Sequence, residues 1–181
     1  MSDDIHIEDL ARRAAGGDEA ALDRLLAEIA PRTLRRCLRF LPCRQDAEEA
    51  CQDALLQVAT HIQEFGGRSK FSTWLYVVVA NCARQTYRSL KRRSAEQPHA
   101  LLPVDVADPR TTSVIAGSRL DFLDALDRLG AYRPELVTPL VLRDICQLGY
   151  EEIAEHLAIP GGTLKSRVHD ARLHVRASLN S

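Results

Sequence analysis

Apolar residues recur every three or four positions along most of the chain, a spacing that places them on one face of an α-helix. In the first half the pattern predicts helices over Glu19–Ile29, Thr33–Leu41 and Asp46–Ile62, and a longer one from about Ser72 to Arg93. Alternating runs of β-branched residues, which would indicate strands, do not occur. The first half of the sequence is therefore predicted to be helical.

Residues 94–117 break this pattern. The segment contains Pro98, Pro103 and Pro109, has no Phe, Tyr or Trp and shows no sustained period, so it is predicted to be a linker. Helical spacing then returns and predicts a helix beginning near Leu120, followed by Leu136–Cys146, Tyr150–Leu157 and Thr163–Leu179. The predicted fold class is all-α: two small helical domains, 1–93 and 118–181, joined by a flexible linker.

The composition, 181 residues of which 45% are hydrophobic, is that of a soluble protein with packed cores. No apolar run approaches the roughly 18 residues that cross a bilayer, and the first ten residues are acidic, so neither a membrane span nor secretion is expected. The five cysteines lack CxxC spacing, which fits the reducing cytoplasm better than disulfides or zinc. Cys37 and Cys51 take apolar helical positions and are predicted core residues, while the role of Cys43 stays open.

The formal net charge of −1 conceals an uneven distribution. Residues 67–93 carry seven basic side chains and no acidic one, and residues 156–181 carry four basic and one acidic. Blocks of this kind are candidate phosphate-binding surfaces, although a solvated Arg-rich helix face has the same composition. Charge alone leaves the two interpretations equally open.

Aromatic residues lie within the first basic block: Phe71, Trp74, Tyr76 and Tyr87. Rings among Arg and Lys suit single-stranded DNA, because each base stacked on a ring contributes about 1–3 kcal/mol beside phosphate neutralisation. Some of these rings must belong to the core, and Trp74, between helical apolar neighbours, is predicted to be buried rather than stacked on a base.

The segment 149–168 has the spacing of a helix-turn-helix. Its predicted second helix turns Leu164 and Val168 inward, and Pro160 presets the backbone for the start of that helix. Two glycines at this start would let the backbone approach a phosphate. Outward positions on the second helix, suited to phosphates and base edges, are Lys165, Ser166, Arg167, His169 and Arg172.

The segments 140–144 (LVLRD), 149–155 (GYEEIAE) and 159–172 (IPGGTLKSRVHDAR) resemble region 4 of bacterial extracytoplasmic-function sigma factors of the sigma-70 family. The resemblance implies that the second helix reads the minus-thirty-five promoter element. The contact residues expected there are Gly162, Thr163, Lys165, Ser166, Arg167, His169 and Arg172. Asp170 and Gly149 depart from the usual residues of the family, so no promoter sequence is predicted.

An independent resemblance lies upstream, where 46–55 (DAEEACQDAL) and 71–75 (FSTWL) are similar to regions 2.2 and 2.3 of the same family. It implies that the acidic and amide face of the 46–64 helix docks on the clamp helices of the largest polymerase subunit. The residues expected in that contact are Glu48, Glu49, Gln52 and Asp53.

The same resemblance implies contact between the basic block and the minus-ten element. The Phe65–Lys70 loop would hold a flipped base, and the helix after it would grip the DNA backbone. The predicted contact residues are Arg68, Lys70, Ser72, Asn81, Arg84, Arg88, Lys91 and Arg92.

No catalytic residue, metal site or cofactor is predicted, because the six histidines are scattered and no phosphate-cradling loop or nucleophile elbow is present. The resemblance implies a cytoplasmic sigma factor whose partners are core RNA polymerase, through the clamp helices and the flap of the second subunit, promoter DNA, and an anti-sigma protein that grips both domains. Two alternatives remain: a stand-alone DNA-binding regulator that uses 149–173, and a protein-interaction module.

Overall fold

The computed structural model describes residues 2–67, 69–96 and 114–179, and all regular secondary structure within these ranges is helical. The elements in chain order are α1 (Ser2–Ala15), α2 (Glu19–Phe40), α3 (Arg44–His61), a 3-10 turn η1 (Ile62–Glu64), α4 (Phe71–Glu96), α5 (Val114–Tyr132), α6 (Pro134–Leu140), a π-helical turn η2 (Val141–Ile145), α7 (Tyr150–Leu157) and α8 (Gly161–Leu179). The predicted all-α class is confirmed.

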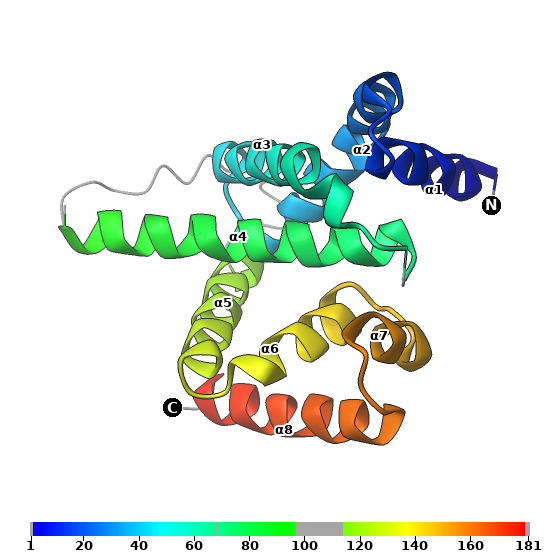
Figure 1. Ribbon diagram of the computed structural model, residues 1–181. Helices are drawn as coiled ribbons and strands as arrows, with labels where there is room; N and C mark the ends of the chain where they lie inside the picture. The colour runs from blue at the N-terminus through cyan, green and yellow to red at the C-terminus, as the bar shows by residue number, and fades with distance from the viewer. Residues whose placement is uncertain (1, 68, 97–113, 180–181) are drawn as a thin grey trace.

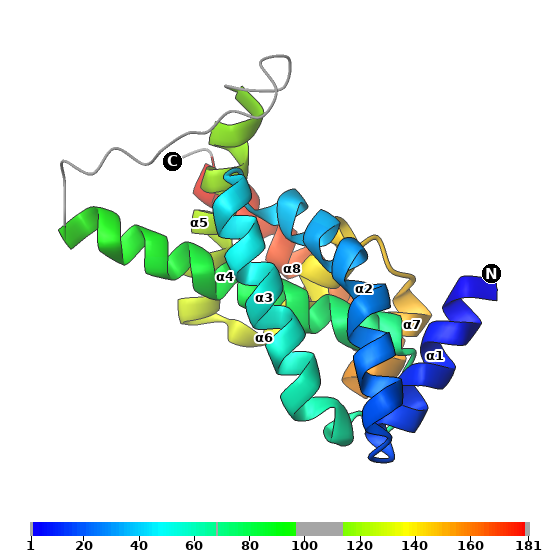
Figure 2. The same cartoon turned by 90° about the horizontal axis from the view of Figure 1, so that it is seen from above.

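The long helix α4 separates two groups of helices (Figure 1). Helices α1, α2 and α3 pack on one side of it, and α5, η2 and α7 contact its other side, with α6 and α8 beyond. Figure 2 shows the same arrangement from above, with α2 and α3 crossing over α4. The predicted fold of two helical domains is thus confirmed, and the two domains contact each other.

The first domain is held together by apolar faces at helical spacing. Leu25 and Ile29 of α2 and Val58 of α3 are buried in its core, as the sequence pattern requires. Helix α2 begins where the Oδ1 atom of Asp18 accepts a hydrogen bond from the backbone N–H of Ala21 (3.0 Å), a side-chain N-cap.

Helix α2 differs from the sequence prediction, because it is continuous where Glu19–Ile29 and Thr33–Leu41 were expected to be separated by Pro31. Proline lacks the N–H that a helix interior uses and normally breaks or kinks the helix. Here both halves of α2 bury one face in the core, since Ile29 and Cys37 are both buried there. Tertiary packing therefore overrides the local cost of the proline.

The second domain contains one irregular turn. The predicted helix Leu136–Cys146 is α6 followed by η2, in which the N–H of Cys146 donates to the carbonyl oxygen of Val141 (3.0 Å), five residues earlier. Arg143 donates from Nη1 to the carbonyl oxygen of Leu148 (2.7 Å), and this hydrogen bond fixes the segment that leads into α7. The helix predicted from near Leu120 begins at Val114, and α1 was not predicted, whereas the remaining predicted helices start and end within about three residues of those observed.

The predicted linker lies mostly outside the described residues, which exclude 97–113. Helix α4 ends at Glu96 and α5 begins at Val114, so helix extends into both ends of the segment 94–117. All three prolines used in the linker prediction fall within 97–113. The domain boundaries at residues 93 and 118 stay a prediction.

An aromatic cluster fixes the start of α4. Phe71 is fully buried, and its ring lies 5.6 Å from that of Phe65 and 5.7 Å from that of Trp74. Glu8 of α1 accepts hydrogen bonds from the backbone N–H groups of Phe71 (2.9 Å) and Ser72 (3.4 Å). The cluster and this carboxylate together anchor the loop that precedes α4.

We predict that Phe71→Ala will lower the free energy of unfolding by about 3–5 kcal/mol, because truncation leaves a cavity in a fully buried position. Urea unfolding followed by fluorescence will measure the loss, since Trp74 is the chain's single tryptophan and lies beside Phe71. Tyr132→Ala is the control, because that side chain is 86% exposed. Equal stability of the two variants would contradict the assigned packing.

Candidate polymerase and nucleic-acid interfaces

The docking face predicted on α3 is largely open to solvent. Glu49, Gln52 and Asp53 are exposed, with Gln52 and Asp53 about one helical turn after Glu49, while Glu48 is half-buried. Glu48 also accepts a hydrogen bond from Nε of Arg44 (2.8 Å), so it is the least available of the four predicted residues. Glu49, Gln52 and Asp53 form a continuous surface of acidic and amide side chains.

Leu56 extends this surface and was missed in the sequence-based prediction. Its side chain is 61% exposed, which is unusual for leucine in a helix that packs against neighbours on its other side. Leu56 follows Gln52 and Asp53 by four and three residues, so all three share one face of α3. In the sequence, Leu56 is an apolar residue that falls outside the apolar face of this helix, and this position could have indicated its exposure.

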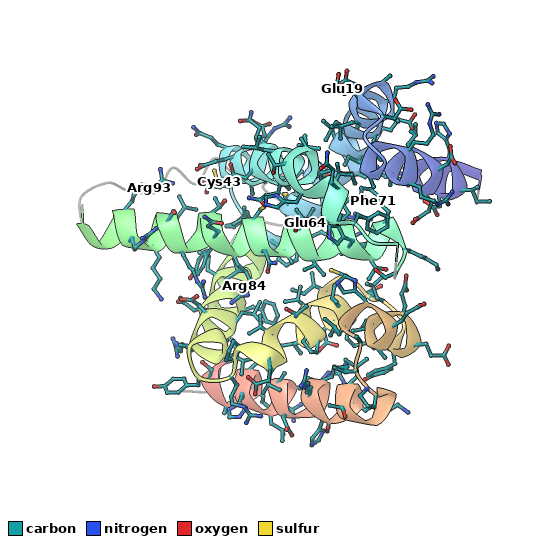
Figure 3. The ribbon with its side chains drawn as sticks, viewed as in Figure 1. Glu19, Cys43, Glu64, Phe71, Arg84 and Arg93 are labelled. Carbon is teal, nitrogen blue, oxygen red and sulfur yellow. The ribbon has the colours of Figure 1, made fainter. Side chains whose placement is uncertain are left out.

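The predicted minus-ten residues on α4 fall on one face of the helix. Asn81, Arg84, Arg88 and Lys91 are separated by three or four residues, which brings them into line. This face points toward the second domain, and Arg84 lies between α4 and α5 (Figure 3). Arg92 is off this line, exposed, and hydrogen-bonded to the Oγ atom of Ser89 (3.3 Å).

Carboxylates of α5 pair with two of these cations. Nε of Arg88 donates to Oδ1 of Asp127, and Nζ of Lys91 donates to Oδ1 of Asp124 (2.5 Å). Burial opposes ionisation of Asp124, but hydrogen bonds from Lys91 and Tyr87 outweigh it, so the pKa of Asp124 is lowered. The basic face of α4 therefore lies against an acidic face of α5.

Arg84 lies close to α5 at a glycine. A Cβ atom added to Gly130 would lie 2.8 Å from Nη2 of Arg84 and 3.6 Å from that of Arg88. Burial, and then the charge of Arg88, lower the pKa of Arg84, which remains protonated at neutral pH. The missing side chain of Gly130 therefore leaves room for the guanidinium groups of α4.

The residues that precede α4 contact α7. Nζ of Lys70 lies 3.8 Å from Oε1 of Glu152, and the same oxygen accepts a hydrogen bond from Thr73 (2.9 Å). Oγ of Ser69 lies 2.8 Å from Nδ1 of His156. Burial lowers the pKa of His156, so the neutral imidazole is favoured at this contact. Of the other predicted residues here, Ser72 is half-buried, and Arg68 lies outside the described residues.

The helix-turn-helix prediction agrees with the packing of α7 and α8. Ile153 on α7 and Leu164, Val168 and Ala171 on α8 are buried. Ala158 ends α7 in the left-handed conformation (φ 52°), and α8 begins at Gly161, directly after Pro160. The hydrophobic sides of both helices are therefore those predicted.

Most of the predicted minus-thirty-five residues are exposed along α8: Gly162, Lys165, Ser166, His169 and Arg172 are exposed, and Thr163 and Arg167 are half-buried. Arg172 has a partner within the domain, because its guanidinium donates two hydrogen bonds to Asp144 (2.9 and 2.5 Å). The hydrogen bonds and the charge of Asp144 raise the pKa of Arg172. This ion pair connects α8 to η2.

The prediction that Cys37 and Cys51 are core residues is confirmed. Cys37 and Cys51 are buried, Cys43 is half-buried, and all five thiols are free. Burial raises the pKa of Cys37 to about 12 and that of Cys146 to about 12, so both stay protonated at neutral pH.

Within the described ranges, no group of three or more His, Cys, Asp or Glu residues is arranged to hold a metal ion. No helix in these ranges has the length and apolarity needed to cross a bilayer.

Two family models match the chain in the order in which the two interfaces occur. Sigma-70 region 2 matches residues 25–93, and Sigma-70, region 4 matches residues 134–175. The chain belongs to the ECF sigma factors of the sigma-70 family. It is an alternative sigma factor, which directs RNA polymerase to promoters.

Named relatives agree with this family. The sigma factor is 33% identical to the ECF RNA polymerase sigma factor SigE of Mycolicibacterium smegmatis over 168 residues, which are 90% of this chain and 64% of SigE. It is 29% identical to the RNA polymerase sigma-H factor of Pseudomonas aeruginosa, covering 91% of this chain and 89% of that protein. Its fold is similar to that of CnrH, solved in complex with the cytosolic domain of CnrY, with a TM-score of 0.52, 20% identity and 97% of both chains covered.

We predict that contact between the two domains of the sigma factor weakens as the pH falls below the ordinary histidine pKa of about 6.5. Because burial lowers the pKa of His156, the closed arrangement binds fewer protons than an open one. Above that pKa His156 is neutral in both arrangements and does not affect closure. Below it, the open arrangement gains a proton on His156 that the closed arrangement binds less well, so closure is opposed. The charged groups at this contact, Lys70 and Glu152, pair with each other.

Sedimentation velocity measured from about pH 8 to about pH 5.5 spans this titration. The sedimentation coefficient of the wild type should fall as the domains separate. His156→Gln keeps a hydrogen-bonding side chain but cannot titrate, so its profile should be flatter. Identical profiles for the two proteins would exclude His156 as the group responsible.

Proposed function

We propose that this sigma factor docks on core RNA polymerase through the exposed face of α3, reads two promoter elements with α4 and α8, and helps to open the DNA. The observation that carries this proposal is the division of one chain into faces of different charge. An acidic and amide face lies on α3, a basic face lies on α4, and a helix-turn-helix follows in the second domain. A stand-alone regulator would need only the last of these.

The α3 face has the features of a protein interface. The exposed side chain of Leu56 follows Glu49 and Asp53 on the same face of α3, and contact cores are commonly apolar with a polar rim. The partner that we propose is the pair of clamp helices of the largest polymerase subunit, with Gln52 as a hydrogen-bonding group. Glu49 forms a long ion pair with Nη2 of Arg93 (3.9 Å), and its side chain is 52% exposed, so it is accessible to a partner.

The proposed minus-ten contact uses the start and the basic face of α4. Lys70 and the loop before it lie at the helix start, where Glu8 and the aromatic cluster hold the backbone in place. Arg84, Arg88 and Lys91 then follow along one face, which suits the phosphates of a single strand. Trp74 is half-buried against the core and contacts Phe65 and Phe71, so we assign it a packing role.

The proposed minus-thirty-five contact uses the start of α8. Added Cβ atoms at Gly161 and Gly162 would meet nothing within 4 Å, so packing within the chain does not require these glycines. The bare backbone at this helix N-terminus leaves the N–H groups accessible to a phosphate, which the helix dipole also attracts. Lys165 and Arg167 lie on the turn that would enter the major groove.

Further partners follow from the family. We propose that the second domain also contacts the flap of the second polymerase subunit and that an anti-sigma protein grips both domains. CnrH, which has a similar fold, was solved with the cytosolic domain of another protein. RNA synthesis belongs to the polymerase, so this chain needs no catalytic group of its own. The five free thiols fit the cytoplasm as its location.

Run-off transcription with purified core polymerase and a pool of genomic fragments tests the proposed function. We predict initiation with the wild type and about tenfold weaker binding to core polymerase for Glu49→Lys/Asp53→Lys, because two reversed charges repel a basic partner surface. Fluorescence anisotropy with labelled sigma factor measures the affinity.

Glu19→Lys/Asp23→Lys is the matched control, since both residues are exposed and acidic on α2, outside the predicted contact. Its affinity for core polymerase should equal that of the wild type. Wild-type failure to initiate on every fragment would overturn the proposed function. Equal weakening by both double variants would remove the α3 face from the docking site.

For the recognition helix, we predict that Arg167→Ala lowers the affinity for a promoter fragment recovered from that pool by about tenfold. The slope of log affinity against log salt concentration should also fall by about one, because one phosphate contact is lost. Arg176→Ala is the control, because Arg176 is exposed in the last turn of the same helix. Titrations at several salt concentrations give both quantities. If the two variants bind alike, α8 does not enter the groove by its N-terminal half.

A further inference from the structure

The residue at the N-cap of α4 cannot cap the helix with its side chain. Lys70 holds this position, because its carbonyl oxygen accepts the first helical hydrogen bonds, from the N–H groups of Thr73 (3.0 Å) and Trp74 (3.2 Å). An N-cap side chain normally accepts a hydrogen bond from the second or third N–H of the helix, and a lysine side chain has no acceptor atom. The helix that carries the proposed minus-ten residues therefore needs a cap from elsewhere.

Helix α1 supplies this cap from 63 residues earlier in the chain. The carboxylate of Glu8 accepts hydrogen bonds from the N–H of Phe71 at Oε2 (2.9 Å) and from that of Ser72 at Oε1 (3.4 Å). The carbonyl oxygen of Lys70 accepts the next one, from Thr73. The first three N–H groups of α4, which have no ordinary helical partner, are thus all satisfied, and the negative charge suits the positive end of the helix dipole.

Packing and an ion pair hold α1 where this contact requires it. Leu10 and Ala14 are buried, and α1 packs against α2, η1 and α4. Helix α1 and the start of α4 lie at the same end of the first domain (Figures 1 and 2). Oδ1 of Asp4 also accepts a hydrogen bond from Nη1 of Arg32 on α2 (2.9 Å). The Glu8 carboxylate is therefore carried by an element that is fixed to the core.

We propose that Glu8 is a positioning residue for the minus-ten contact: it holds the first turn of α4 in the shape that base recognition requires, without contacting the DNA. The inference rests on the proposed minus-ten function of α4. Glu8 is half-buried, and both of its carboxylate oxygens accept hydrogen bonds from the backbone of α4. The match to Sigma-70 region 2 begins at residue 25, and no predicted contact residue lies on α1.

The use of a remote cap has a chemical reason at position 70. Ser, Thr, Asp or Asn at this position would cap α4 locally, but would replace a cation at the proposed DNA contact with a neutral or acidic group. The side chain of Lys70 is 71% exposed. Capping by Glu8 therefore allows position 70 to present a positive charge while the first turn of the helix remains ordered.

The size of the expected effect follows from the energetics of helix caps. Loss of a capping acceptor shifts a local equilibrium by a factor of about 2 to 30. If the first turn frays, a smaller fraction of the protein has the binding-competent shape, and the apparent affinity falls in proportion. Binding by charge alone does not require that shape, because Arg84, Arg88 and Lys91 lie farther along α4. Recognition of the minus-ten bases should therefore weaken while non-specific binding is kept.

The test compares Glu8→Ala with Asp9→Ala. Asp9 is the neighbouring carboxylate on α1, is exposed and pairs with Arg12 of the same helix (3.6 Å). Holoenzyme formed with core polymerase is titrated with two labelled oligonucleotides of equal length. One is the non-template strand just upstream of a start site mapped in the run-off pool, and the other is an oligothymidylate.

Glu8→Ala should bind the promoter strand about threefold to tenfold more weakly than the wild type and the oligothymidylate equally well. Asp9→Ala should match the wild type with both oligonucleotides. Equal weakening with both by Glu8→Ala would reduce Glu8 to a purely structural role and overturn the proposal. Tighter binding of the promoter strand would overturn it as well, because the carboxylate would then act by repelling phosphate.

Amide hydrogen exchange of the sigma factor tests the cap directly. Exchange at Phe71 and Ser72 should be faster in Glu8→Ala than in the wild type. Glu8→Gln has the same length and one acceptor oxygen, so its exchange and its preference for the promoter strand should lie between those of the wild type and Glu8→Ala. Adding Lys70→Ser to Glu8→Ala should slow exchange at Ser72 again, because serine caps locally. Unchanged exchange in Glu8→Ala would overturn the proposal.

Failure of the proposed function gives a different result. If the wild type initiates transcription and Glu8→Ala keeps the wild-type preference for the promoter strand, the positioning role falls and the sigma function stands. If the wild type initiates on no fragment, the sigma function falls and the positioning role falls with it, while faster exchange at Phe71 and Ser72 in Glu8→Ala would still identify Glu8 as the cap of α4.

Discussion

The arrangement of the whole molecule depends on α4 being packed on two opposite sides. One side buries Phe71, Leu75 and Val79 against α1, α2 and α3, and this hydrophobic burial fixes the helix in the first domain. The other side carries polar and charged residues and meets the second domain through ion pairs and hydrogen bonds. This second contact also has an apolar part, where Val77 and Ala80 of α4 lie beside Val137, Val141 and Leu142, so hydrophobic packing joins α4 to both domains.

Helical periodicity predicted most of the fold, because apolar side chains at helical spacing have few ways to leave water. Tyr150–Leu157 was predicted with the ends that are observed, and the inward positions Leu164 and Val168 are buried. Periodicity failed at Pro31 and at η2, where packing around a local irregularity decided the backbone. Such packing involves residues far apart in the sequence, so the periodicity within a short segment does not predict it.

The candidate sites were predictable only as sets of residues. The sequence identified Arg88 and Lys91 as cations, and the family resemblance gave them a role, but neither indicated Asp124 and Asp127 as their partners. Glu8 was missed for the same reason, since its contact with the start of α4 spans more than 60 residues. Which charges meet depends on the tertiary arrangement. A net charge of −1 is therefore compatible with DNA binding, because part of the acidic complement faces the basic surface within the same molecule.

The pairing of Arg88 with Asp127 has a consequence for how variation at these positions is read. In the proposed function Arg88 serves two partners, the carboxylate of Asp127 and a DNA phosphate. On that proposal, replacing Arg88 would remove both a phosphate contact and the ion pair with α5, so a genetic screen would measure the combined effect of the two losses. Replacing Asp127 would remove the ion pair alone. Variation at Asp127 would therefore report on the contact between α4 and α5, whereas variation at Arg88 would report on that contact and on DNA binding together.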